Sequence, residues 1–471
     1  MSTAPRGSCN RKRTSSQVLS ACLLLLCCPP LASAASRELV LGKIKVNSGA
    51  SERIDTPVWF RCRWSEVLGA RKALPENQQL LLREVGRRSP PIPVQWLPEP
   101  AFPWEKARDE GVLAWILPGR TSRGVTRTFT LVLKEEPPLP PDFLVEDIDR
   151  TQLLVRRGAR RVLRYNYGVI AEVKGRTGPY DRAAYIHPVW TPGGKVITGD
   201  FSPEHIHQRG IYLAPRKVNF GEVETDFWGL GSSTGRMLPD GRAPVIRNGP
   251  VVTEILIHNQ GRVAGQIRLR EVLSIRIWAH PAGHTWLFDV RTRQAPLDPA
   301  RPDEAPGQSV TMVWAKVYYG GMAFRGTAEW LSRASKDVAR ALERGVEFPG
   351  YKWLPPDVSL DVLTSEGKDR VGGDRTAARW IDYTGPLNGD WGGVVMFDHP
   401  SNLRYPTPLR IHPELPYFCY ALAHNEPVVI RGDQPLDLCY RILVHSGRPN
   451  RDLNEGFARD FAHPPQVIWE R

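Results

Sequence analysis

The hydrophobic positions of this chain recur in short runs of alternating apolar and polar residues, separated by turn residues at close spacing. A period of two is typical of strands that bury one face and leave the other in water. The N-terminal region contains several such runs and no histidine. We therefore expect residues 35–136 to form a small N-terminal β-sandwich with an accessory role. The runs that carry this expectation are 39–46, 57–63, 79–83, 92–96, 112–117 and 126–133.

Strand-like runs continue through residues 143–471. One segment differs, because residues 328–345 carry apolar side chains at three-to-four spacing and end at a glycine, which predicts a single helix. Roughly fifteen strands with one helix are too many for a small barrel and favour two large antiparallel sheets packed face to face. The predicted fold class is all-β.

A stiff proline-rich joint separates the two predicted domains. Residues 137–142 begin Pro-Pro-Leu-Pro-Pro, and such a sequence adopts an extended, semi-rigid conformation. The whole chain has 43 prolines and 41 glycines, which suits many short strands joined by turns. The joint at residues 137–142 is therefore the predicted linker.

Residues 1–34 have the three parts of a secretory signal peptide. Basic residues come first, an apolar core runs over 18–28, and Ala32-Ser33-Ala34 supplies small residues at the cleavage site. A lipoprotein anchor at Cys22 is disfavoured, because the apolar stretch follows that cysteine instead of preceding it. We expect cleavage near Ala34 and export to a periplasmic or extracellular location. No later run is long enough to predict a membrane span.

Charge and cysteine content narrow the possible partners. The chain has 63 basic and 50 acidic residues, but the excess is dilute and accompanies no nucleic-acid-binding module, so nucleic acid is not an expected partner. An anionic glycan is compatible with a basic surface. Beyond the signal peptide only Cys62, Cys419 and Cys439 remain. The last two lie in neighbouring strand-like runs, and their pairing stays open.

The candidate chemistry lies in a cluster of histidines in the second domain. His187 is followed by the segment Glu204-His205-Ile206-His207-Gln208-Arg209. If this segment is extended, its period of two places His205, His207 and Arg209 on one face. Their mutual repulsion favours neutral imidazoles, which can carry protons, while the arginine can hold a carboxylate or sulfate.

A metal site is the weaker interpretation of the same cluster. The two histidines of His-x-His are potential ligands, and His187 with Glu204 or Asp200 could complete a coordination shell. No His-Glu-x-x-His motif occurs in the chain. A divalent metal therefore remains a possibility, with His187, His205 and His207 as ligands, but no cofactor is favoured.

Aromatic and polar residues elsewhere could complete a sugar site. Aromatic rings stack on the C–H faces of sugars, and carboxylates and amides bind their hydroxyl groups. The side chains assigned to substrate binding are Arg209, Tyr185, Trp228, Tyr319 and Asn402, and Asp382 joins Glu204 and the three histidines as a candidate catalytic residue.

Several blocks in order resemble a known family. The blocks are YIHPVWTPGGKVITGDFSPEHIHQRGIY, YYGG, ARWIDYTG, FDHPSN and LDLCYRILVHSGR. Over residues 161–461 they resemble the family labelled methane oxygenase PmoA, although Glu204 and Gln208 stand where that family usually has aspartate and histidine. The label implies a metal-dependent oxidoreductase. At the level of fold, the chain resembles the mutarotase-like supersandwiches of carbohydrate epimerases and polysaccharide lyases.

Three functions follow as hypotheses. The first is an exported carbohydrate-active enzyme, of lyase, epimerase or hydrolase type, in which His205 or His207 acts as acid or base with Glu204 or Asp382 as partner. The second is a glycan-binding protein without catalysis. The third is the metal-dependent oxidoreductase that the resemblance implies. Sugar identity, linkage and oligomeric state do not follow from the sequence.

Overall fold

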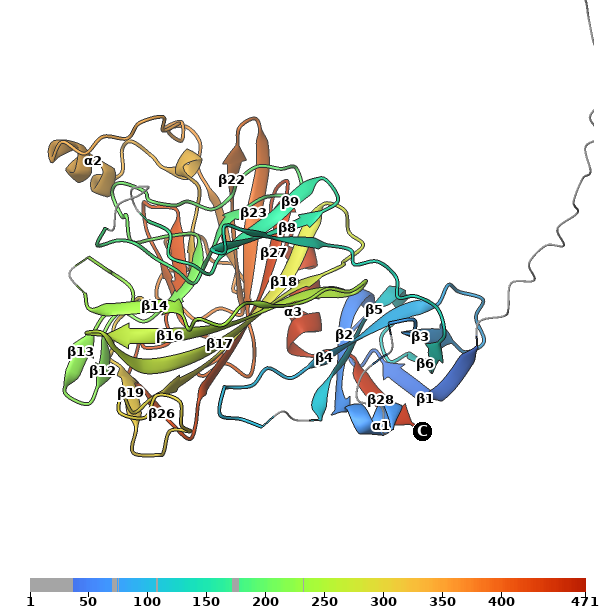
Figure 1. The fold of residues 1–471 in the computed structure, drawn as a ribbon. Coiled ribbons are helices and arrows are strands. Elements are labelled where there is room, and N and C mark those ends of the chain that lie inside the picture. The colour runs from blue at the N-terminus through green and yellow to red at the C-terminus, as the bar shows by residue number, and fades with distance from the viewer. Residues whose placement is uncertain (1–36, 70–73, 75, 107–108, 172–177, 232) are drawn as a thin grey trace, which may run out of the picture. The chain divides into compact units, whose positions relative to one another are not determined.

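The alternating runs before the linker form six strands of an antiparallel seven-stranded sheet in the computed structural model (Figure 1). The structure describes residues 37–471 except 70–73, 75, 107–108, 172–177 and 232, so the predicted signal peptide lies outside the described residues. The strand order is β2-β5-β4-β3-β6-β1-β28, and the sheet curls around a core that includes Leu82, Trp115 and Leu131. Its elements are β1 (Glu38–Asn47), β2 (Arg53–Arg63), α1 (Trp64–Leu68), β3 (Gln79–Glu84), β4 (Ile92–Pro98), β5 (Glu110–Thr121), β6 (Thr126–Lys134) and β28 (Gln466–Glu470).

Two large antiparallel sheets make up most of the second region, which confirms the all-β fold class. They share one apolar core, to which Tyr165 and Phe324 contribute from one sheet and Ile275 and Tyr383 from the other. The eight-stranded sheet contains β24 (Leu409–Ile411), β25 (Tyr417–Tyr420), β20 (Gly321–Arg325), β11 (Ile211–Ala214), β10 (Tyr185–Val189), β9 (Arg160–Asn166), β8 (Gln152–Arg157) and β7 (Leu144–Ile148), in that order. The nine-stranded sheet contains β14 (Gly235–Pro239), β16 (Val252–Val263), β17 (Gln266–Trp278), β18 (Thr285–Pro296), β27 (Leu436–Ser446), β23 (Asp390–Asp398), β22 (Trp380–Leu387) and β21 (Asp361–Thr364), with β15 (Val245–Arg247) paired to β16.

The predicted helix is shorter than the sequence pattern suggests. A 3₁₀ turn, η1 (Ala328–Trp330), is separated from α2 (Lys336–Glu343) by a non-helical stretch. Ser332 Oγ accepts a hydrogen bond from Ala334 N at 3.2 Å, and such local serine bonds compete with helical backbone bonding. A small sheet completes the region, with β13 (Val223–Thr225), β12 (Val218–Phe220), β19 (Thr311–Trp314) and β26 (Val428–Arg431) in that order.

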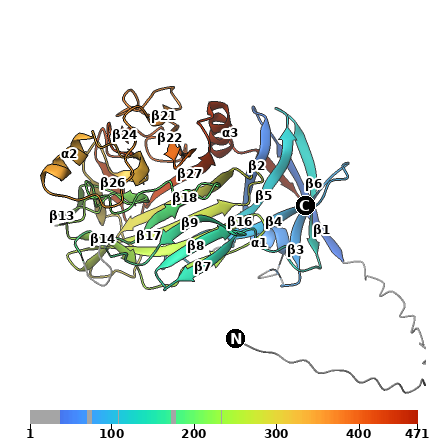
Figure 2. The ribbon, with the colours of Figure 1, turned by 90° about the horizontal axis from the view of Figure 1, so that it is seen from above.

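A longer helix, α3 (Arg451–Ala462), joins the N-terminal sheet to the outer face of the nine-stranded sheet (Figure 2). Phe461 packs in one buried cluster with Trp278 of β17 and Leu97 of β4. Asp460 receives a hydrogen bond from Arg53 Nη1 at 2.7 Å and another from Thr56 Oγ1 at 2.6 Å. These contacts bury charge and apolar surface together, so α3 links the two regions.

The end of the chain returns to its beginning. β28 pairs antiparallel with β1, and Figure 1 shows it in red among the blue N-terminal strands. The sequence analysis does not predict this strand. The N-terminal sheet is therefore completed only by residues that follow the second region in sequence.

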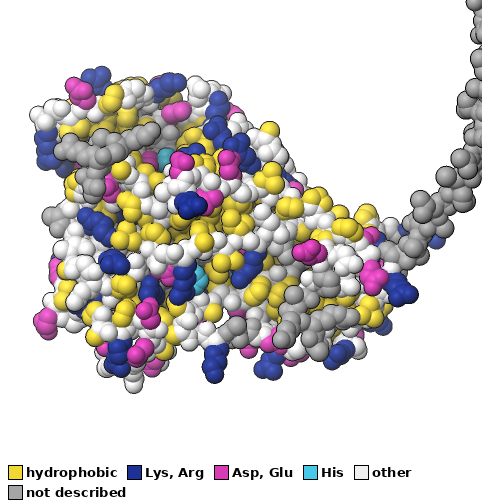
Figure 3. Space-filling model, viewed as in Figure 1, with side chains coloured by type: hydrophobic (Ala, Val, Ile, Leu, Met, Phe, Trp, Pro, Cys, Tyr) yellow, Lys and Arg dark blue, Asp and Glu magenta, His cyan; other side chains and the backbone are white. Residues whose placement is uncertain are grey.

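Three further findings concern cysteines, membrane spans and surface charge. Cys62, Cys419 and Cys439 are all free thiols, so the pairing left open above does not form. Within the described ranges, no helix is long and apolar enough to cross a membrane. On the face shown in Figure 3, basic and acidic side chains are interspersed rather than gathered into a patch of one sign.

Candidate functional site

The segment that carries His205 and His207 is a loop, residues 199–210, whose two ends are hydrogen-bonded to each other. Gly210 N donates to Gly199 O at 2.8 Å, so the two ends of the loop meet. Gly210 has a φ of 57°, and a Cβ there would lie 2.1 Å from Ile186 O. A Cβ on Gly199 would lie 2.3 Å from Gly326 O. Only glycine fits at either position, because each backbone approaches a neighbouring strand end too closely for a side chain.

Inside the loop, the backbone makes turns instead of extending. His205 N donates to Ser202 O at 3.0 Å, and Gln208 N donates to His205 O at 2.9 Å. The period-two arrangement expected for an extended segment is therefore absent here. His205 and His207 still come together, with ring centroids 5.5 Å apart. Arg209, with no exposed side-chain surface, points elsewhere.

These two histidines line a pocket of about 320 Å³, which we call the histidine pocket. Its walls come from the loop, from the segments around β11 and β12, and from the strands β20, β24 and β25 or their ends. Among the described residues that line it there is no carboxylate. The lining side chains are His205, His207 and His412, the aromatic residues Tyr180, Trp228, Tyr318, Tyr319 and Tyr417, the arginines Arg216 and Arg410, and Gln208.

Burial keeps the pocket imidazoles neutral. It lowers the pKa of His207 to about 3, with the neighbouring charge of His205 as a second cause. The pKa of His205 is lowered by burial and then by the nearby Arg325 guanidinium. His205 Nδ1 is buried without a hydrogen-bond partner in the described structure, and no described residue hydrogen-bonds to either ring nitrogen of His207. His207 therefore retains ring nitrogens that a ligand can use, whereas Nδ1 of His205 is shielded from the pocket.

The third histidine has its orientation fixed. His412 Nδ1 accepts backbone N–H groups from Glu414 at 3.2 Å and Leu415 at 3.0 Å. The proton of a neutral His412 therefore lies on Nε2, which is 3.4 Å from a carboxylate oxygen of Asp337 in α2. Its ring centroid is 6.0 Å from that of His205. His412 is a rigid wall of the pocket rather than a free base.

Aromatic rings form a further part of the wall, beside His207. The Trp228 ring centroid is 6.4 Å from that of His207 and 5.7 Å from that of Tyr319. The Tyr319 hydroxyl accepts a hydrogen bond from Arg216 Nε at 3.2 Å, and Arg216 also forms an ion pair with Asp226. A phenol that accepts from a guanidinium keeps its own proton free to donate toward the pocket.

Glu204, a candidate catalytic residue, lies behind the histidines and does not line the pocket. It forms an ion pair with Arg325, and neither side chain has exposed surface. Arg325 also donates to Ser202 Oγ at 2.8 Å and to Gln208 Oε1 at 3.0 Å. Burial raises the pKa of Glu204, but Arg325 and the Ser202 hydroxyl outweigh that effect, so the pKa lies below its ordinary value. Glu204 is thus a charged partner of Arg325.

His187, Tyr185 and Arg209 form a separate cluster around Asp200. Arg209 Nη2 donates to Asp200 Oδ2 at 3.0 Å, and the Tyr185 hydroxyl donates to the same oxygen at 3.1 Å. His187 Nδ1 lies 2.9 Å from Thr198 Oγ1, and burial lowers its pKa to about 4. None of the three predicted residues lines the histidine pocket.

Asp382 and Asn402 lie outside the pocket as well. Asp382, fully buried on β22, accepts hydrogen bonds from Thr384 Oγ1 and from Asn454 Nδ2 of α3, both at 2.7 Å. Asn402 Nδ2 donates to Asp398 Oδ1 at 2.7 Å. Their polar atoms are engaged in holding a helix and a loop in place.

The three histidines expected as metal ligands, His187, His205 and His207, do not lie together in one site. His187 belongs to the Asp200 cluster, whereas His205 and His207 face the histidine pocket. Over the part of the chain that the structure describes, no group of three or more His, Cys, Asp or Glu side chains is arranged to hold a metal ion.

Among the pocket residues that sequence reasoning missed are Arg216, Arg410, His412 and Tyr417. Arg410 and His412 are two positions apart at the end of β24 and point to the same side, as the strand period requires. That spacing is visible in the sequence, but nothing in it shows that β24 lies three strands from the loop that bears His205.

Comparison with known proteins corrects the family expected from the sequence blocks. No curated protein matches the chain. The family model that does match, over residues 152–458, is the one described as a family of unknown function, DUF6807, and not the methane oxygenase PmoA family. The oxidoreductase implied by that label accordingly loses its support. Because the match spans more than half of the 471 residues, the chain belongs to the DUF6807 family of unknown function.

Proposed function

We propose that this protein is an exported carbohydrate-active enzyme that uses acid–base chemistry in the histidine pocket. The observation that carries the proposal is the pairing of neutral imidazoles, on His205 and His207, with a wall formed by Trp228 and Tyr319. Both imidazoles are unprotonated at neutral pH, as a general base must be, and a bound substrate carboxylate raises the low pKa of His207 toward the range in which it accepts a proton. Trp228 is buried and supports Tyr319, and phenol rings such as those of Tyr318 and Tyr319 stack on sugar faces.

The pocket favours removal of a carbon-bound proton over glycoside hydrolysis. Glycosidases of most families use a pair of carboxylates, and the described lining contains none. In a lyase step, His207 takes the proton next to a sugar carboxylate, the C–O bond to the leaving group breaks as a C=C bond forms, and Tyr319 protonates the departing oxygen. Arg216 and Arg410, paired with Asp226 and Asp374 outside the lining, donate N–H groups to the substrate carboxylate.

An epimerase would use the same groups without the bond cleavage. His207 would remove the proton from one face of the sugar carbon, and a second group would return a proton to the other face. The arrangement of rings around the pocket is compatible with either outcome, and the assay must therefore detect both.

The decisive experiment combines two measurements on a panel of neutral and uronate-containing glycans. Formation of an unsaturated sugar, followed by its ultraviolet absorbance, reports a lyase; uptake of deuterium from heavy water, followed by mass spectrometry, reports an epimerase. His207→Ala should reduce turnover about 10²–10⁴-fold, the usual contribution of a general base. His258→Ala is the matched control, since His258 is also half-buried but lies on β16 outside the pocket.

The outcomes separate catalysis from binding alone. A folded His207→Ala protein with turnover near that of His258→Ala contradicts the assigned role. Binding of glycans without turnover by the wild type would indicate a glycan-binding protein that uses the same pocket only for recognition.

Export is a separate part of the proposal. It rests on the order of basic, apolar and small residues over positions 1–34. Mass spectrometry of the secreted protein should find an N-terminus at or near Ala35. A mature chain that begins at Met1 contradicts export, and a chain that carries lipid on Cys22 contradicts cleavage near Ala34.

A further inference from the structure

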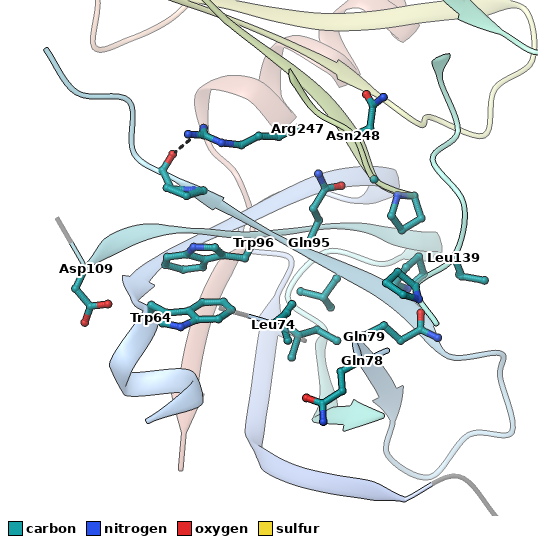
Figure 4. A pocket seen from close by; sticks show the side chains of 17 residues that line it. Trp64, Leu74, Gln78, Gln79, Gln95, Trp96, Asp109, Leu139, Arg247 and Asn248 are labelled. Carbon is teal, nitrogen blue, oxygen red and sulfur yellow. Dashed lines mark hydrogen bonds between the residues drawn. The ribbon is translucent and has the colours of Figure 1, made fainter. Parts of the chain in front are cut away.

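A second pocket, of about 540 Å³, lies where the N-terminal sheet meets the turn between β15 and β16. One wall carries Trp64, at the start of α1, and Trp96, on β4. The facing wall carries Asn248 and Gly249, and Leu139 of the linker lies at one end (Figure 4). We call this the junction pocket. Its volume is within the range of roughly 300–1,000 Å³ that small-molecule sites occupy.

The junction pocket is held open by direct contacts between its walls. Gln95 Oε1, on β4, accepts a hydrogen bond from Val252 N, on β16, at 3.1 Å. Gly249 packs so closely against the same side chain that a Cβ would lie 2.2 Å from Gln95 Oε1. Asp142 N donates to Gly249 O at 3.4 Å. The cavity is therefore preformed, and a ligand need not order it.

Two indoles give the pocket an aromatic surface. The ring centroids of Trp64 and Trp96 are 5.0 Å apart with their planes inclined at 49°. Figure 4 shows the two rings one above the other at one end of the pocket. Trp96 is half-buried, so part of its ring is available to a ligand. Aromatic faces of this kind stack on the apolar C–H faces of sugar rings.

The polar groups around the indoles are mainly amides, and the one carboxylate of the described lining, Asp109, accepts hydrogen bonds from the backbone and hydroxyl of Ser65. Gln78 Oε1 is buried and has no hydrogen-bond partner among the described residues, and the exposed side chain of Asn248 adds an amide at the opposite wall. Arg247 forms an ion pair with Glu254, which neutralises its charge. Its Nη1 also lies 3.5 Å from Pro98 O (dashed in Figure 4). Amides that can both donate and accept match sugar hydroxyl groups.

We propose that the junction pocket binds an uncharged segment of a glycan chain. Indoles beside amides, with the nearby arginine engaged by Glu254, suit neutral sugars. The histidine pocket has a different lining, with three imidazoles and two arginines, and each arginine pairs with an aspartate outside the lining (Arg216 with Asp226, Arg410 with Asp374). The junction pocket thus holds polysaccharide through contacts that are independent of the acid–base residues, and the inference stands whether or not the histidine pocket is catalytic.

Binding should be measured on the full chain with the histidine pocket disabled by His205→Ala and His207→Ala. Native gels containing soluble neutral polysaccharides (a xylan, a β-glucan and a galactomannan), with an alginate gel for comparison, report retardation, and calorimetry with neutral hexasaccharides reports affinity. In this background Trp96→Ala should weaken neutral-glycan binding about tenfold or more, equivalent to about 1.4 kcal/mol. Trp104→Ala is the matched control, because Trp104 is also half-buried but lies outside the pocket.

A second variant covers the case in which Trp96→Ala does not fold. Asn248→Trp places a large side chain at an exposed position on the pocket wall and should block binding without disturbing the core. Equal binding by the Trp96→Ala and Trp104→Ala proteins overturns the proposal. So does undiminished binding by Asn248→Trp, retardation by alginate alone, or a failure of every neutral glycan to bind.

Discussion

Replacing Glu204 by Gln tests whether this carboxylate stabilises the histidine loop or takes part in chemistry. Glu204 and Arg325 have no exposed side-chain surface, and their ion pair ties the loop to β20. The substitution preserves the shape of the side chain but removes its charge. The buried guanidinium of Arg325 is then left with the neutral oxygens of Ser202 and Gln208.

The magnitude follows from the burial of the pair. Removing one partner of a buried ion pair lowers the free energy of unfolding by about 3–5 kcal/mol, because the other charge stays desolvated. The glutamine oxygen and two existing acceptors can still receive hydrogen bonds from Arg325, so we expect a loss near the lower end, about 3 kcal/mol. Urea m-values rise with protein size, so a chain of 471 residues should lie at or above about 3 kcal/mol per M, the upper end for small proteins, and the unfolding midpoint should fall by about 1 M or somewhat less.

Urea unfolding, followed by tryptophan fluorescence, measures this loss. The matched control is Glu52→Gln, because Glu52 pairs with Arg120 at the surface and such a pair is worth about 0–1 kcal/mol. Adding Arg325→Met to Glu204→Gln should restore part of the stability, since the unpaired charge is removed. A Glu204→Gln protein that unfolds at the wild-type midpoint yet has no turnover refutes the reasoning and gives Glu204 a chemical role.

The same pair predicts an acid limit. Because the pKa of Glu204 is lower in the folded protein than its ordinary value of 4.5, the folded state binds fewer protons than the unfolded chain. Its contribution to stability is therefore complete above pH 4.5 and is lost as the pH falls below that value. The difference between the wild type and Glu204→Gln should shrink over the same interval.

Three further predictions address the histidine pocket, β22 and the N-terminal sheet. The pKa of His207 falls from 6.5 to about 3 on folding, so the stability that its neutral form contributes is present above pH 6.5 and is lost as the pH falls toward 3. Between pH 7 and pH 4, the melting temperature of His207→Gln should therefore fall less than that of the wild type, as measured by scanning calorimetry. Asp382→Asn should lower the free energy of unfolding by about 1–3 kcal/mol, because it disturbs bonds to Thr384 and Asn454, while kcat/KM stays within twofold; a loss of turnover without loss of stability contradicts this. Deleting residues 38–136 should cause aggregation on size-exclusion chromatography, because β28 loses its partner β1 and the buried face around Trp278 is uncovered; a monomeric, cooperatively melting product contradicts it.

The local pattern of apolar and polar residues predicted the fold class, but it did not predict that the last strand of the chain pairs with the first. Strand alternation depends on neighbouring residues, so runs such as 126–133 are visible in the sequence and correspond to β6 (Thr126–Lys134). The pairing of β28 with β1 joins residues more than 400 positions apart, which no short-range pattern encodes. The sequence does contain a local pattern typical of a helix at α3. The Asn450 side chain caps Leu453 N at 3.0 Å, and Leu453, Phe457 and Phe461 follow at four-residue spacing.

The site was predictable only where its residues are close in sequence. His205 and His207 were identified because they are two positions apart, and they do share a pocket. Arg209 shares their spacing, but the turns in the loop direct its guanidinium toward Asp200. His412 lies some two hundred positions away and reaches the pocket only through the strand order β24-β25-β20-β11.

The buried ion pairs explain how an irregular loop can hold two imidazoles in place. Asp200 and Arg209 lie at the two ends of the loop and pair with each other, while Glu204 at its middle pairs with Arg325 of β20. Each carboxylate also neutralises a guanidinium that would otherwise be an unpaired charge within the protein. The histidines therefore project from a backbone fastened at three points, which supplies the rigidity that a strand would give. Because the loop is fixed by charges behind the pocket, the side chains in front of it remain free to meet a ligand.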